Sequence, residues 1–125
     1  MAQKNLVGQT VLGYTVIEKI NSGAFGTVYK VEKVNPSGKY VRALKHITIP
    51  TDKQYISVLN SMGGDISKAD NYFSEKLKDI VLEIQILNDL SEKGVEHIVR
   101  YYENDIIMTD APKRYDVYIL MEYLT

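Results

Sequence analysis

The chain has 125 residues, 45% hydrophobic and 25% charged, the composition of a globular protein with room for one domain or part of one. Its net charge of -1 gives no reason to expect a nucleic acid or an anionic membrane as partner. Cysteine is absent, which excludes disulfides and thiolate metal sites, and His46 and His97 lack the spacing of metal ligands. Because no stretch resembles a signal peptide or a membrane span, we expect a cytoplasmic protein.

Three β-strands are predicted in the first part of the chain. After a polar lead-in at residues 1–13, apolar and polar residues alternate at 14–20 and again at 27–34. Residues 35–38, Asn-Pro-Ser-Gly, form a strong turn signal, and a third alternating run covers about 39–47. Short turns between such runs predict an antiparallel meander.

A long helix follows, and two more strands complete the prediction. Apolar side chains recur every three or four residues from Phe73 to Leu90, which is one face of an α-helix. Ser67 or Asp70 is the expected cap at its start, and Gly94 follows its end.

Residues 97–108 and 115–123 are then predicted as the fourth and fifth strands. The fold class is therefore α+β: a five-stranded antiparallel sheet with one main helix between strands 3 and 4.

Two glycines and a lysine stand out within this pattern. Gly23 and Gly26 lie in the turn between the first two strands, where the lack of a Cβ lets backbone N–H groups approach a phosphate. Lys45, on the third strand, could supply the positive charge that a bound phosphate needs. The alternative is a plain hairpin turn and a solvated lysine.

These elements, in this order, resemble the N-terminal lobe of the eukaryotic-type protein kinases over residues 14–125. The third strand ends in Ala43-Leu44-Lys45, like the family's V-A-I-K, and Glu83 matches the helix glutamate that pairs with its lysine. Residues 117–124 look like the fifth strand running into the interlobe hinge. The family's G-x-G-x-x-G-x-V loop is matched by four residues: Asn21, Gly23, Gly26 and Val28.

The resemblance implies ATP as the ligand, with Lys45 and Glu83 as catalytic-site residues. Lys45 would hold the α- and β-phosphates, and Glu83 would orient Lys45 through an ion pair. Hydrophobic residues would sandwich the adenine, Met121 would be the gatekeeper, and backbone groups of the hinge would bond the adenine edge. The implied nucleotide-binding residues are Ile20, Asn21, Gly23, Phe25, Gly26, Val28, Ala43, Lys45, Met121, Glu122 and Leu124.

Two departures from the family matter. The interval between Lys45 and Glu83 is longer than usual, so residues 48–74 form an insertion, either an extra short helix or a loop. Glu75 would be the competing lysine partner if the helix were in another register. The second departure is that the C-terminal lobe, with the catalytic aspartate and the Mg²⁺ ligands, is absent, so this chain alone is not expected to catalyse.

The resemblance thus implies half of a kinase, most simply of the Ser/Thr class, whose protein substrate would bind through the absent lobe. The alternatives are a pseudokinase-like or half-kinase scaffold module and, less in keeping with the motifs, an unrelated α+β domain. The face that the second lobe would cover should be apolar and should drive self-association. That face is expected to include Leu87, Tyr101, Met121 and Leu124.

Overall fold

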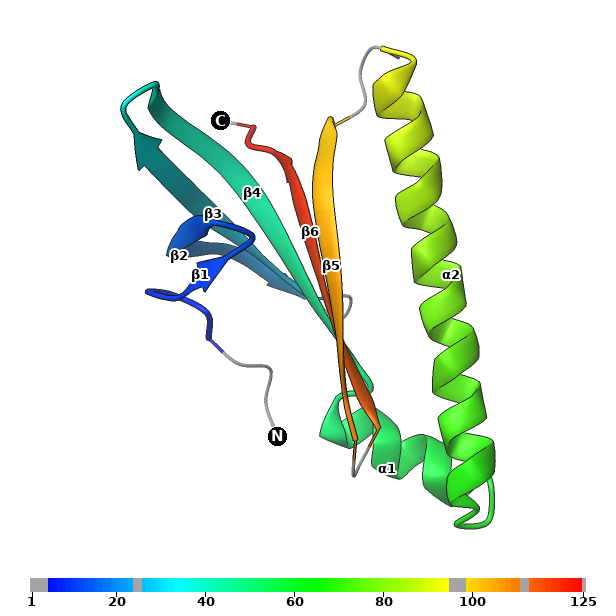
Figure 1. Ribbon diagram of the computed structural model, residues 1–125. Coiled ribbons are helices and arrows are strands. Elements are labelled where there is room, and N and C mark those ends of the chain that lie inside the picture. The colour runs from blue at the N-terminus through cyan, green and yellow to red at the C-terminus, as the bar shows by residue number, and fades with distance from the viewer. Residues whose placement is uncertain (1–4, 24–25, 95–98, 111–112, 125) are drawn as a thin grey trace.

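The computed structural model describes residues 5–23, 26–94, 99–110 and 113–124. These residues form one antiparallel sheet and two helices, with strand order β1-β2-β3-β4-β6-β5 (Figure 1). The strands are β1 (Thr10–Val11), β2 (Tyr14–Gly23), β3 (Gly26–Asn35), β4 (Gly38–Ile49), β5 (Tyr101–Thr109) and β6 (Arg114–Glu122), and the helices are α1 (Asp52–Ser61) and α2 (Ile66–Glu92).

The predicted α+β class and the kinase-like order of elements are confirmed, but the predicted count of five strands is wrong. The sixth strand, β1, lies inside the expected lead-in and pairs with β2, so that Val11 faces Tyr14. Leu12 and Gly13, which connect them, both have positive φ, at 53° and 83°. Two consecutive positive φ values are typical of a type I′ hairpin turn. Because leucine rarely adopts positive φ, the sequence does not indicate this turn.

The two faces of the sheet are covered by different parts of the chain. On one, which we call the outer face, Leu6 from the N-terminal segment joins Tyr29, Leu44 and Leu120 in a buried cluster. Helix α2 lies alongside the sheet (Figure 1), and its Ile84 packs against β6 on the other face, the inner face. Because side chains alternate along a strand, Leu44 points outward while its neighbours in β4 point to the inner face.

The expected insertion contains helix α1, which agrees with the short-helix alternative for this segment, and α2 is the predicted main helix. Thr51 accepts a hydrogen bond from the Gln54 backbone N–H at 3.2 Å, and the Gln54 side chain accepts one from the Thr51 N–H at 2.9 Å. This capping box satisfies backbone donors at the helix start. The Asp52 carboxylate pairs with Arg114 of β6, and Tyr55 stacks on Phe73 of α2 with ring centroids 6.4 Å apart. Helix α1 is thereby fixed to both the sheet and α2.

Helix α2 begins earlier than predicted. Its cap is Asp65, whose side chain accepts from the Lys68 backbone N–H at 3.2 Å, and neither Ser67 nor Asp70 has this role. Its end agrees with the prediction, since Gly94 follows the last turn with φ +67°. Within the described residues, neither helix is long and apolar enough to cross a membrane.

Candidate functional site

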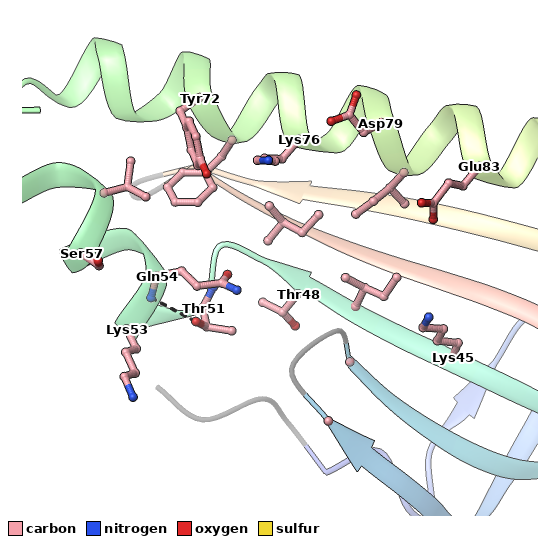
Figure 2. Close-up of a pocket in the computed structure, with 17 residues that line it drawn as sticks. Lys45, Thr48, Thr51, Lys53, Gln54, Ser57, Tyr72, Lys76, Asp79 and Glu83 are labelled. Carbon is pink, nitrogen blue, oxygen red and sulfur yellow. Dashed lines mark hydrogen bonds between the residues drawn. The ribbon is translucent and has the colours of Figure 1, made fainter. Parts of the chain in front are cut away.

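A cleft of about 790 Å³ opens between the inner face of the sheet and the two helices. Four of the predicted site residues line it, although they are far apart in sequence: Gly23, Gly26, Lys45 and Glu83. Figure 2 shows β4 and the β2–β3 hairpin along one side of the cleft, α2 along the other, and α1 at one end.

The packing of the sheet requires glycine at position 26 but not at position 23. Gly26 has φ +131°, and a Cβ added there would lie 2.5 Å from the backbone oxygen of His46 in β4. Gly26 is therefore needed for the close approach of two strands. An added Cβ at Gly23 would meet no atom within 4 Å, so the space beside Gly23 is open to a ligand. Phe25, between them, lies outside the described residues.

Lys45 and Glu83 face this cleft from opposite walls (Figure 2). Lys45 is half-buried in β4, directly across from Val28 of β3, whereas Glu83 is exposed on α2. Both are described residues, and no ion pair joins them in this structure. The pairing implied by the family resemblance therefore stays a prediction, and the Lys45 ammonium is available to an anionic ligand.

The residues expected around the adenine lie on the same sheet but do not line the cleft. Ala43 is buried and pairs in register with Met121, and Val28 of β3 pairs with Lys45, two residues further along β4. Ile20 and Leu124 are 48% and 65% exposed. This side of the expected pocket is thus open in the isolated chain.

Two further expected nucleotide residues occupy ordinary strand positions. Asn21 belongs to β2, opposite Val28, and does not adopt the positive φ that its place in the motif suggested. Glu122 ends β6, and its backbone N–H donates to the Arg100 carbonyl at 2.8 Å. Its carbonyl, the group expected to bond adenine, is a separate atom, so this contact does not exclude that role.

Sequence reasoning missed the end of the cleft that α1 builds. Gln54 and Ser57 of α1 and its N-cap Thr51 line this end, and Tyr72 and Lys76 line it from the first half of α2. The sequence does carry a signal for the start of α1, because Thr51-x-x-Gln54 after Pro50 is a capping-box pattern. Three lysines and two carboxylates line the whole cleft, so its charge favours an anionic ligand.

A separate polar cluster lies on the outer face. His46 is 1% exposed, stacks on Tyr118 at 4.7 Å and shares a 2.8 Å hydrogen bond with Asp116. Burial raises the pKa of Tyr118, and the carboxylates of Asp116 and Asp105 raise it further. Because His46 is buried on the face opposite the cleft, we assign it a structural role.

No protein-family model and no curated protein matches the chain. Solved structures do match, among them the crystal structure of a point mutant of the Mycobacterium tuberculosis PknI kinase domain, at 22% sequence identity and a TM-score of 0.50. The match covers 99% of this chain and 37% of that chain, so the present sequence spans less than half the length of that protein. The chain therefore has a protein kinase-like fold, corresponding to a kinase N-lobe.

Proposed function

We propose that this chain is the ATP-binding N-lobe of a protein kinase, of the Ser/Thr class, acting in the cytoplasm. Joined to a C-terminal lobe, it would help to transfer the γ-phosphate of ATP to protein hydroxyls. The observation that supports this is the convergence of Gly23, Gly26, Lys45 and Glu83 on one cleft of a kinase-like fold.

The residues present fit a nucleoside triphosphate. The space beside Gly23 is open, so the hairpin backbone can approach phosphate oxygens, and the Lys45 ammonium faces the same space without a carboxylate partner among the described residues. A cation placed there offsets phosphate charge, and Glu83 would fix its direction once α2 or the side chains bring the two together. The Mg²⁺ ligands would come from the C-terminal lobe.

The first experiment is a calorimetric titration of the chain with Mg-ATP. We expect weak, saturable binding that Lys45→Met reduces by at least about tenfold, because a charge-assisted hydrogen bond contributes about 1.5–3 kcal/mol. Lys78→Met is the matched control, since Lys78 lies outside the cleft on the same protein and pairs with Glu75 at 3.0 Å. Equal binding by both variants would overturn the nucleotide proposal.

The second candidate function is a non-catalytic, pseudokinase-like binding module. Asn21 in place of the first loop glycine and the inserted helix α1 favour it. Phosphotransfer to serine or threonine, measured with this chain joined to a C-terminal lobe, separates the two candidates. ATP binding without phosphotransfer in that protein would select the binding module.

A further inference from the structure

The end of the cleft beside α1 differs in its lining from the end that contains Lys45 and the hairpin glycines. We call it the α1 compartment and define it by three apolar and three polar lining residues: Ile49, Val58, Phe73, Gln54, Ser57 and Lys76. These come from β4, α1 and α2, so the compartment exists because the insertion folds into a helix. Lys45 and the glycine hairpin lie at the other end (Figure 2).

One wall of the compartment is apolar. Ile49 and Phe73 are 7% and 5% exposed, and Val58 is half-buried. The stacking of Tyr55 on Phe73 and the Asp52–Arg114 ion pair hold this wall in place. The whole cleft, of which the compartment is one end, has a volume of about 790 Å³, which lies within the range of small-molecule sites.

The polar groups of the compartment are mainly donors. The Gln54 side-chain oxygen already accepts from the Thr51 N–H at 2.9 Å, which leaves the Gln54 amide NH₂ group to donate. The Lys76 ammonium lies 5.4 Å from the centre of the Tyr72 ring and forms no ion pair within the described part of the chain. The Ser57 hydroxyl adds a third donor.

The carboxylates of the cleft lie further along α2. Asp79 and Glu83 follow Lys76 by one and two turns, towards the Lys45 end of the cleft (Figure 2). A ligand seated against α1 would therefore meet the donors of Gln54, Ser57 and Lys76 before it met an acidic side chain. Exposed donors that line the cleft beside an apolar wall match a ligand with an apolar body and an anionic group.

We propose that the α1 compartment binds a small amphipathic carboxylate. Its hydrocarbon part packs against Ile49, Val58 and Phe73, and its carboxylate accepts hydrogen bonds from Gln54 and Lys76. The binding is non-covalent and needs no nucleotide, so it does not rest on the proposed kinase function. The ligand would occupy the same cleft as a bound triphosphate, at the opposite end.

The test uses decanoate as the probe, with the nucleotide-free chain and probe concentrations below micelle formation. Calorimetry should show saturable binding to one site. Lys76→Ala should weaken it by about tenfold, the effect of removing one charge-assisted hydrogen bond, and Gln54→Leu should weaken it less. Lys78→Ala, on the same helix and paired with Glu75, should bind as the parent chain does. Circular dichroism of each variant checks that both helices remain.

Decanol, which has the same chain without the charge, is the matched ligand control and should bind about tenfold more weakly. Equal binding of decanol and decanoate, or equal loss in Lys76→Ala and Lys78→Ala, would overturn the proposal by showing adsorption to an apolar surface. Absence of decanoate binding, with binding only of an acidic peptide, would also overturn it in favour of a protein partner. Since no nucleotide is present, none of these outcomes depends on ATP binding.

Discussion

At the scale of single residues, the hairpin glycines show how one motif can serve two purposes. Gly26 lies where β3 approaches β4, with a φ of +131° and the His46 backbone oxygen in the place of a Cβ. Gly23, three residues earlier, has open space around it. The first glycine thus leaves room for a ligand, while the second is required by the sheet itself.

We predict that Gly26→Ala destabilises the fold by about 2 kcal/mol or more, because it adds backbone strain and a contact with an atom that cannot move aside. The measurement is the free energy of unfolding from urea denaturation. Gly23→Ala is the control and should change that free energy by less than about 0.5 kcal/mol, since nothing opposes its Cβ. Similar losses in both variants would contradict this account of Gly26.

Part of this site could be predicted from sequence, and part depends on distant segments. The alternation around Lys45 is a local pattern, and the structure has a strand there. The strand before the hairpin runs further than predicted, because residues 21–23, expected in the turn, belong to β2. The need for glycine at position 26 comes from His46, twenty residues away, which no local pattern reveals. Whether Lys45 pairs with Glu83 likewise depends on how α2 docks, and the spacing of residues along a helix does not determine that.

At the scale of elements, the helix starts show where local signals compete. Three residues near the start of α2 could serve as its cap, namely Asp65, Ser67 and Asp70, and the apolar periodicity alone favoured the later two. The structure selects Asp65 because Gly63 and Gly64, with φ of +66° and +78°, turn the chain from α1 directly into α2. The first turn of α2 is therefore fixed by the preceding turn.

We predict that Asp65→Ala lowers the free energy of unfolding by about 1 kcal/mol, the usual cost of losing an N-cap hydrogen bond. Ser67→Ala, in the first turn, should leave stability within about 0.5 kcal/mol, because it removes no cap. Urea denaturation followed by circular dichroism at helical wavelengths measures both. A larger loss in Ser67→Ala than in Asp65→Ala would show that the helix begins at the later cap.

Helix α1 and strand β1 differ in whether the local sequence could predict them. Helix α1 carries a capping box at Thr51 and Gln54, a local signal that is sufficient to predict a helix start. Strand β1 has only two residues, and its turn places Leu12 at positive φ, which is rare for leucine. Pairing with β2, and not local preference, creates β1.

At the scale of the whole molecule, the order of the elements was predictable but the shape of the cleft was not. Strand and helix periodicities are local, and they gave the kinase-like succession around Lys45 and Glu83. The cleft depends on α1 packing between the end of β4 and the first half of α2, through the Tyr55–Phe73 stack and the Asp52–Arg114 pair. These are contacts between segments up to 62 residues apart.

The face that a second lobe would cover is less exposed than expected. Leu124 is 65% exposed, but Leu87, Tyr101 and Met121 are half-buried within the sheet and α2. The Tyr101 and Met121 side chains pack against the buried cluster around Ile84. The apolar area that could drive self-association therefore depends mainly on the chain around Leu124.

We predict weak, reversible self-association that depends on concentration and is measured by sedimentation equilibrium. Leu124→Asp should weaken it by about tenfold or more, since burying one leucine contributes about 2 kcal/mol. Val34→Asp is the control: Val34 is 73% exposed near the β3–β4 turn and is not among the residues expected on the interlobe face, so its substitution should leave association unchanged. Strictly monomeric behaviour of the parent chain at all concentrations would exclude an associating face. Equal effects of the two substitutions would show that the associating face includes the β3–β4 hairpin.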